Sequence, residues 1–378
     1  MGHEGNGKIP FTMRSLATEK YCKPDEYRLL PLPVPQITGK DEILIKVHAA
    51  SVNPIDVKVA SGLAKMILST KFPHKLGYDV SGTIAAVGEG VASSCPELKP
   101  GVEVYSRVPE ECRGTASEYA LSTVSATAVK PTSLSHIEAA SVPLATLTTL
   151  QALDIANKNL DGGLKGKTVY IPGGLSATGS MAIQLAKNVF GVAKVITTVS
   201  TSKVVKVAEL LGKDAADQII DYTMEDPTKI ITPGSVEFMY NTMNQGTTCL
   251  HLMKKGGVIV SISGAAFGPE LKEIAPDMAF SLRWIMNTIG AFIQYRSQRY
   301  GVKYLRLYMR PSADDLNRLS QWFDQGLIKT VVGRVAELDD VEDVQKGCQE
   351  VFSGKGGVGK FVIEVHKPEK SSQETVRS

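Results

Sequence analysis

The sequence is poor in cysteine, and its cysteines lie far apart. There are five of them, an odd number: Cys22, Cys95, Cys112, Cys249 and Cys348. This wide spacing argues against a disulfide framework, and the sequence has no compact group of four cysteines that could form a structural zinc site. It is typical of a reducing compartment, so we expect a cytoplasmic protein.

Other features are also missing. The net charge is only +3 with no concentrated basic block, which argues against a nucleic-acid partner. No apolar run reaches the length of a membrane span, and Met1–Lys20 lacks the apolar core of a secretory signal. The 378 residues are 43% hydrophobic and 21% charged, as in globular proteins long enough for two domains.

Residues 167–187 predict a short strand, a turn of small residues and a helix. Such a junction can bind a nucleotide pyrophosphate, because small residues allow close approach and the helix N-terminus offers free N–H groups. Ala177 stands where a middle glycine is expected, and small-residue turns also join many strands to helices without any nucleotide. The turn residues predicted to bind a cofactor are Gly173, Gly174, Ser176, Ala177, Thr178 and Gly179.

Short β-branched runs continue after this turn and alternate with helical or loop segments. The runs are Lys194–Val199, Asp217–Ile220, Val236–Tyr240, Val258–Ile262 and Lys303–Tyr308. Together with the strand before the turn they predict a six-stranded parallel sheet covered by helices on both faces. Six strands fit a doubly wound dinucleotide-binding domain.

The residues after the second predicted strand bear on the choice of cofactor. A carboxylate there would bind the ribose 2′-hydroxyl of NAD. This chain has no Asp or Glu between Asn188 and Ala208, and hydroxyls with a lysine suit a 2′-phosphate instead, so we predict NADPH. Alternatively, the lysine only solvates a helix face. The remaining predicted cofactor-binding residues are Ser200, Thr201, Ser202, Lys203, Tyr222, Ser263 and Gly264.

The residues before this domain follow a different pattern. Glu42–Val52, Gly82–Val87 and Val102–Ser106 are strand-like, and frequent glycines and prolines separate them. Many short strands with dense turn signals predict a β-rich, barrel-like domain. Ser135 and Glu138 form a capping box that opens a helix, and we expect His136 to be an exposed residue of its first turn.

From about residue 25 to 366 the chain resembles the medium-chain dehydrogenases/reductases, in their zinc-less quinone-oxidoreductase branch. The stretches that carry the resemblance are His48–Asp56, Leu76–Gly88, Gly173–Lys187 and Gly359–Ile363. The resemblance implies an α/β fold in which a GroES-like catalytic domain is interrupted by a doubly wound Rossmann domain. The domains expected on this basis are residues 1–143, residues 144–310, and a return to the catalytic domain over 311–378.

The same resemblance identifies the zinc-ligand positions of metal-dependent relatives. Asn53 stands in place of the first cysteine, Tyr78 in place of the histidine, and Asp79 in place of a neighbouring glutamate. A zinc ion needs three or four protein ligands, so we predict no metal. Without a Lewis acid, alcohol dehydrogenation is not expected.

Metal-free hydride transfer favours acceptors that are already electrophilic, such as quinones and α,β-unsaturated carbonyls. We predict Asn53, Tyr78 and Asp56 as catalytic-site residues. Asn53 and Tyr78 would donate hydrogen bonds to the developing oxygen, and Asp56 would orient loops. Asn53 could instead be only a turn residue, and Tyr78 only a pocket wall. Lys58 and Lys65 are weaker candidates for a proton donor.

The sequence therefore predicts an NADPH-dependent, zinc-independent reductase of a hydrophobic carbonyl or quinone. A homodimer is one assembly that this interpretation allows. One alternative is a trans-acting enoyl reductase of a polyketide synthase, which would act only on tethered substrates. Another is a cofactor-binding regulatory protein with little turnover.

Two further segments contain recognisable patterns. Gly354–Lys360 matches part of a phosphate-binding loop, but it leads into a strand and lacks the hydroxyl that follows the lysine, so it is interpreted as a turn. Ala265–Arg310 contains an apolar stretch at helical spacing, Met278–Ile289, that is interpreted as a lid, a dimer contact or a packed helix.

Overall fold

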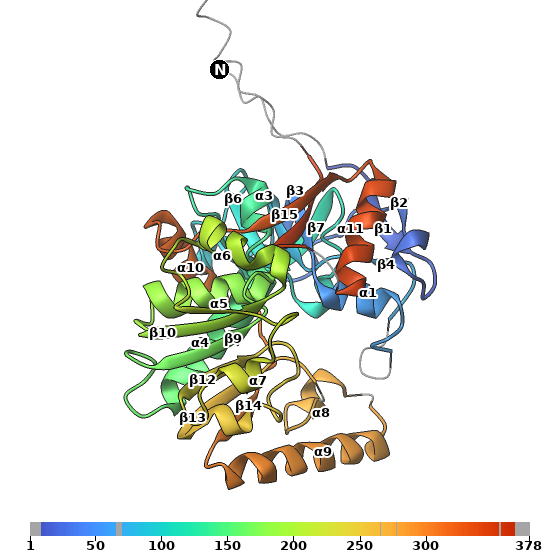
Figure 1. Ribbon diagram of the computed structural model, residues 1–378. Helices are drawn as coiled ribbons and strands as arrows, with labels where there is room; N and C mark the ends of the chain where they lie inside the picture. The colour runs from blue at the N-terminus through green and yellow to red at the C-terminus, as the bar shows by residue number, and fades with distance from the viewer. Residues whose placement is uncertain (1–8, 66–69, 265, 277, 355–356, 367–378) are drawn as a thin grey trace, which may run out of the picture.

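The structure is a computed structural model, and it describes residues 9–65, 70–264, 266–276, 278–354 and 357–366. The chain forms two lobes, each built around its own main sheet (Figure 1). The outer ends of the predicted domains and residues 355–356 of the Gly354–Lys360 turn lie outside the described residues.

The first lobe is β-rich, as predicted. Its larger sheet has the order β15–β16–β3–β5–β6–β8, with β7 beside β3, and a smaller sheet has the order β2–β1–β4. The strands are β1 (Thr12–Thr18), β2 (Arg28–Pro33), β3 (Glu42–Val52), β4 (His74–Lys75), β5 (Asp79–Val87), β6 (Glu103–Arg107), β7 (Tyr119–Thr123), β8 (Thr127–Val129), β15 (Val332–Glu337) and β16 (Lys360–Glu364). Its helices are η1 (Pro24–Glu26), α1 (Pro54–Ala60), α2 (Val91–Ser94), η2 (Glu110–Cys112), η3 (Val124–Ala126), α3 (His136–Ala140) and α11 (Val341–Ser353).

The end of the chain completes this lobe. Strand β16 pairs antiparallel with β3, with Phe361 opposite Val52 and Ile363 opposite Ala50. Residues more than 300 positions apart therefore share one sheet, as an interrupted catalytic domain requires. The boundaries at residues 143 and 310 stay predictions.

The second lobe contains the predicted parallel sheet. Its order is β11–β10–β9–β12–β13–β14, and every neighbouring pair is parallel. In sequence order this is 3-2-1-4-5-6, the doubly wound dinucleotide-binding topology, which confirms the predicted fold class. The strands are β9 (Thr168–Pro172), β10 (Lys194–Val199), β11 (Gln218–Asp221), β12 (Val236–Asn241), β13 (Met253–Ser261) and β14 (Lys303–Arg306).

Both faces of this sheet are covered. In β9, Val169 and Ile171 belong to one buried cluster and Tyr170 to another, because alternate side chains point to opposite faces. The helices of this lobe and its connections are α4 (Pro143–Asn159), α5 (Ala177–Asn188), η4 (Thr201–Lys203), α6 (Val204–Leu211), α7 (Pro227–Ile230), η5 (Leu250–Leu252), α8 (Leu271–Ile274), α9 (Phe280–Arg299) and α10 (Ala313–Asp324).

Helix α9 accounts for much of the segment that sequence left open. It runs along the lower edge of the molecule in Figure 1, and Gly290 on its inner side lies against Phe267. A Cβ at Gly290 would come within 2.4 Å of the Phe267 ring, so close packing requires glycine there. Trp284 and Phe292 are exposed on the outer side. The segment is a packed helix, and its action as a lid or dimer contact stays a prediction.

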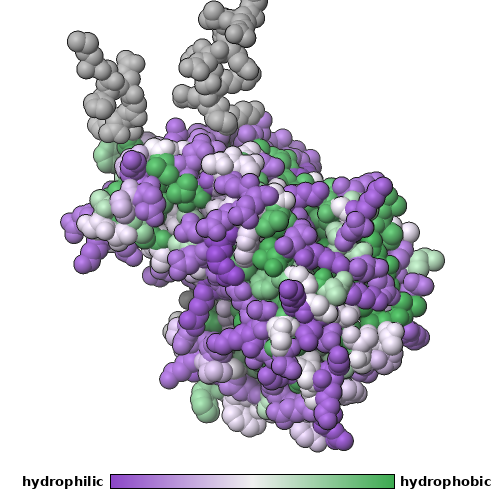
Figure 2. All heavy atoms as spheres, turned by 90° about the vertical axis from the view of Figure 1, so that its left-hand side faces the viewer, coloured by the Kyte–Doolittle hydropathy of each residue, from purple (hydrophilic) through white to green (hydrophobic). Residues whose placement is uncertain are grey.

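The surface is mainly hydrophilic on the face drawn in Figure 2, where hydrophobic side chains form separate patches. Among the described residues, the helices are too short or too polar to cross a bilayer.

Candidate active site

The small-residue turn is a tightly packed strand–helix junction. Ser176 caps helix α5, and its Oγ accepts a hydrogen bond from the Gly179 backbone N–H at 3.0 Å. A Cβ at Gly174 would lie 2.2 Å from Thr197 Oγ1, and one at Gly179 would lie 2.1 Å from the Gly173 carbonyl oxygen. Ala177, the apparent defect of the motif, is the first residue of α5, where alanine is tolerated.

The predicted ribose-contacting residues follow β10. Thr201 and Ser202 are exposed at the start of η4, and Ser200 and Lys203 are partly exposed. Lys203 Nζ donates to the Gly357 carbonyl oxygen at 3.1 Å. Partial burial lowers the pKa of this lysine, and neighbouring Lys206 lowers it further. None of these four side chains is acidic, and their contact with a 2′-phosphate stays a prediction.

The other predicted cofactor residues lie after β11 and β13. Tyr222 is exposed, and the Ser263 hydroxyl donates to the Asn241 carbonyl oxygen at 3.0 Å. Gly264 adopts φ +83°, a conformation that favours glycine. The predicted cofactor residues therefore follow the carboxyl ends of parallel strands, at the edge where doubly wound sheets bind dinucleotides. The junction offers the uncapped N–H groups and close backbone approach that a pyrophosphate needs, so the residues fit a nicotinamide dinucleotide.

Asn53 lies in a buried polar cluster between β3 and α1. It is the N-cap of α1, and its backbone N–H donates to Asp56 Oδ2 at 2.6 Å. Its side-chain Nδ2 donates to Asp79 Oδ2 at 2.8 Å. Asp79 is the first residue of β5 and also accepts bonds from Ser51 Oγ and the Leu144 N–H, at 3.0 and 2.9 Å. The structure therefore brings Asn53 and Asp56 together.

The cluster contains a lysine that sequence reasoning missed. Lys360, the first residue of β16, donates from Nζ to Asn53 Oδ1 at 2.5 Å and to Asp79 Oδ2 at 3.2 Å. It is only 6% exposed. The sequence did contain a sign of this residue, because Lys360 stands directly before an apolar strand-like run. The interpretation of Gly354–Lys360 as a turn assigned no function to the lysine. The predicted strand that follows this turn is confirmed.

Tyr78 is directed to different partners. It is buried, and its hydroxyl donates to Glu110 Oε2 at 2.6 Å. The Arg107 guanidinium lies 4.5 Å from the centre of the Tyr78 ring and pairs with Glu110 at 2.5 Å. Burial, together with the Glu110 charge, raises the pKa of Tyr78. Because the Tyr78 hydroxyl already donates its hydrogen bond to Glu110, the geometry favours the pocket-wall interpretation, and the role of Tyr78 as a donor to substrate stays a prediction.

Asp56 is the most perturbed carboxyl of the cluster. Its Oδ1 is buried and has no hydrogen-bond partner. Burial raises the pKa of Asp56 to about 7, even though the Asn53 N–H bond and, less strongly, the Lys360 charge work in the opposite direction. Asp56 accepts the Asn53 backbone N–H and so fixes the start of α1, and its place in the catalytic site stays a prediction.

The expectation for His136 is wrong. The capping box of α3 is present, but the short helix packs against the first sheet and turns the histidine inward. The His136 ring stacks on His48 with a centroid distance of 4.2 Å, and Nδ1 lies 2.8 Å from Ser81 Oγ. Burial lowers the pKa of His136.

The two predicted halves of the site meet at Gly359. The Gly359 N–H donates to the Leu175 carbonyl oxygen at 2.9 Å, and Gly359 forms a parallel bridge with Ser176. The residue before Lys360 therefore contacts the small-residue turn. The candidate site lies between this turn and the Asn53–Asp79–Lys360 cluster.

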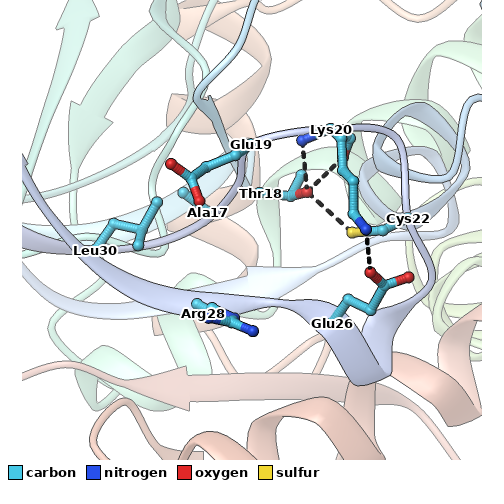
Figure 3. A pocket seen from close by; sticks show the side chains of 8 residues that line it. All are labelled: Ala17, Thr18, Glu19, Lys20, Cys22, Glu26, Arg28 and Leu30. Carbon is cyan, nitrogen blue, oxygen red and sulfur yellow. Dashed lines mark hydrogen bonds and ion pairs between the residues drawn. The ribbon is translucent and has the colours of Figure 1, made fainter.

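A cavity of about 290 Å³ lies away from the candidate site, beside strands β1 and β2 of the smaller sheet (Figure 3). The Lys20–Glu26 ion pair spans it at 2.8 Å. None of the predicted site residues lines this cavity, and a dinucleotide site at strand ends is an extended groove, so we assign no role to it.

The comparisons with known proteins support this arrangement. Residues 39–140 match the alcohol dehydrogenase GroES-like domain, and residues 215–362 match the zinc-binding dehydrogenase family. The chain is 36% identical to 2-methylene-furan-3-one reductase of Solanum lycopersicum over 70% of this chain and 66% of that protein. It is 32% identical to the chloroplastic NADPH-dependent alkenal/one oxidoreductase of Arabidopsis thaliana over 71% of this chain and 67% of that protein.

The chain belongs to the medium-chain dehydrogenases/reductases. Among solved structures of these proteins, the quinone oxidoreductase of Coxiella burnetii has a TM-score of 0.76 and 26% identity. That comparison covers 94% of this chain and all of the other. The match to quinone-oxidoreductase and alkenal/one-oxidoreductase relatives confirms the predicted branch.

The family matched by residues 215–362 of this dehydrogenase/reductase is named for zinc binding. The residues of the candidate site nevertheless do not fit a zinc ion. Asn53 and Tyr78 occupy two of the expected ligand positions, and both side chains are engaged by protein partners. The Lys360 ammonium contacts both Asn53 and Asp79, where it disfavours a second cation. Within the described ranges, no group of three His, Cys, Asp or Glu residues is arranged to hold a metal.

Proposed function

We propose that this medium-chain dehydrogenase/reductase is an NADPH-dependent, zinc-independent reductase of a quinone or an α,β-unsaturated carbonyl compound. One observation carries the proposal: Gly359 contacts the turn that fits a pyrophosphate, and the next residue, Lys360, belongs to the polar cluster of Asn53 and Asp79. The tomato relative is named a 2-methylene-furan-3-one reductase and the Arabidopsis relative an NADPH-dependent alkenal/one oxidoreductase, and both names support the same acceptor class.

The chain's own residues provide binding and polarisation. NADPH, when bound, supplies the hydride that an electrophilic acceptor takes up. The N-terminus of α5 and the Ser176 turn hold the negative pyrophosphate, and Lys203 provides a positive charge for the 2′-phosphate. An amide nitrogen has two hydrogens, and the bond from Asn53 to Asp79 uses one of them. The other is available to stabilise negative charge on the acceptor oxygen.

A screen of acceptors tests this proposal. Purified protein is mixed with NADPH, and its oxidation is followed at the nicotinamide absorbance with quinones, enals, enones and simple ketones. We expect turnover of quinones or conjugated carbonyls, little turnover of simple ketones, and little oxidation of simple alcohols with NADP⁺.

Other outcomes would favour the alternatives. Activity only on substrates tethered to a carrier protein would favour a trans-acting enoyl reductase. Tight NADPH binding with no turnover of any acceptor would favour a regulatory protein.

The proposed compartment is the cytoplasm. The five cysteines are free thiols in the structure, which suits a reducing compartment. The Arabidopsis relative is named as chloroplastic, so an organelle is the competing location. Imaging of the full-length protein with a C-terminal fluorescent tag distinguishes the two.

A further inference from the structure

We propose that Lys360 is a positioning residue for the reduction, and that it acts by holding the side-chain amide of Asn53 in one orientation. The inference rests on the proposed function. Neither the sequence motifs nor the family comparisons assign a role to this lysine. It is identified by its place between two buried partners of the candidate site.

The chemistry of the three side chains leaves the amide a single orientation. An ammonium group only donates hydrogen bonds, and a carboxylate only accepts them. Lys360 Nζ lies 2.5 Å from one end of the Asn53 amide, and Asp79 Oδ2 lies 2.8 Å from the other. The amide oxygen must therefore face Lys360 and the nitrogen must face Asp79. The second amide hydrogen then has a defined direction.

The lysine also balances a buried charge. The Asp79 side chain is fully buried and that of Lys360 is only 5% exposed, with 3.2 Å between Nζ and Oδ2. A buried ion pair is costly to desolvate, and replacing such a pair with apolar residues of similar size often leaves a protein equally stable or more stable. Orientation of a reactive-site amide gives such a pair a function beyond stability.

The backbone connects this lysine to the cofactor turn. Gly359 donates to the Leu175 carbonyl oxygen at 2.9 Å, next to Ser176 at the start of α5. Gly359 therefore contacts the cofactor turn, and the next residue, Lys360, contacts the Asn53 amide. These two consecutive residues fix the position of the amide relative to the turn. An error of about 1 Å in such a placement can cost roughly 100-fold in rate.

A double-mutant cycle tests the proposal, with kcat measured on the best acceptor and NADPH affinity measured by fluorescence. We expect Lys360→Met to lower kcat roughly 10- to 100-fold while the NADPH dissociation constant changes less than about threefold. We expect Lys360→Arg, which keeps a donor-only cation, to recover part of the loss. Lys254→Met is the matched control, because Lys254 is an exposed lysine that pairs with Glu237 on the other lobe.

The cycle separates positioning from a general structural role. If Lys360 acts through Asn53, the double variant Asn53→Ala/Lys360→Met will be no slower than Asn53→Ala alone. Multiplicative losses, or wild-type kcat in folded Lys360→Met, would overturn the proposal. If Lys360→Met does not fold, Asp79→Asn/Lys360→Met removes both buried charges, and the same kcat loss is expected. Failure of the proposed function is a separate result, because wild-type protein would then reduce no acceptor.

Discussion

The ammonium group of Lys360 donates a hydrogen bond to the side-chain oxygen of Asn53, although the two residues are 307 positions apart. One residue opens the last strand and the other caps the first helix after β3. Their contact exists because β16 pairs with β3. It places a positive charge beside Asn53, the residue that the family resemblance matches to the first zinc ligand of metal-dependent relatives.

Replacement of Asp56 by asparagine should change how stability depends on pH. The pKa of Asp56 is raised by burial to about 7 from an ordinary value of 3.8, so the folded state favours the protonated form. This contribution to stability is complete below pH 3.8 and is lost as the pH rises through about 7. By linkage it is on the order of 4 kcal/mol.

Urea unfolding from pH 4 to pH 8 measures this effect. Asp56→Asn keeps an acceptor for the Asn53 N–H. The wild-type protein should lose stability between pH 4 and pH 8, and the free energy of unfolding of the variant should change much less over that range. Asp161→Asn, at an exposed position, is the control and should behave as wild type. The same pH dependence in Asp56→Asn and wild type would contradict the assignment.

NADPH should bind more tightly than NADH. A charge-assisted contact with the 2′-phosphate contributes roughly 1.5–3 kcal/mol, or about tenfold or more in affinity. Fluorescence titration should show Lys203→Glu weakening NADPH much more than NADH, whereas Lys213→Glu, on the surface beyond α6, should affect neither strongly. Equal dissociation constants for the two cofactors would refute the preference.

The purified protein should contain no stoichiometric zinc. Asn53 and Tyr78 are poor replacements for cysteine and histidine, and Lys360 adds a positive charge to the cluster. Elemental analysis checks the metal content, and incubation with a chelator should leave activity unchanged. About one zinc per chain would prove this prediction wrong.

Asn53 and Tyr78 should respond differently to loss of their polar groups. Asn53→Ala removes the amide that we propose donates to the acceptor oxygen, and it should lower kcat by about 10²–10³. Tyr78→Phe removes a hydroxyl that already donates to Glu110, so the expected cost is about 1 kcal/mol of stability with little change in kcat. Steady-state kinetics and urea unfolding of both variants provide the measurement. A large kcat loss in Tyr78→Phe would restore it as a substrate donor.

Local pattern was sufficient for most of the second lobe. The runs predicted as strands after the small-residue turn are strands of one parallel sheet, and the run predicted at Asp217–Ile220 appears as Gln218–Asp221. Short β-branched runs and glycine-containing turns are local features of the sequence. They can therefore be recognised without knowing which strands pair in the folded protein. Helix α9 extends to Arg299, beyond the apolar stretch that predicted it, because its later turns pack against β14 and Phe267.

The sequence by itself determined the two kinds of domain, the small-residue turn between a strand and a helix, and the absence of an acidic residue among Ser200–Lys203. These depend on spacing within a few turns or strands. Only the tertiary structure decided that Lys360 joins Asn53, that Tyr78 donates to Glu110, and that His136 stacks on His48. The physical reason is that buried polar side chains take whichever partner the packed sheets bring to them, and those partners lie tens to hundreds of positions away in the chain.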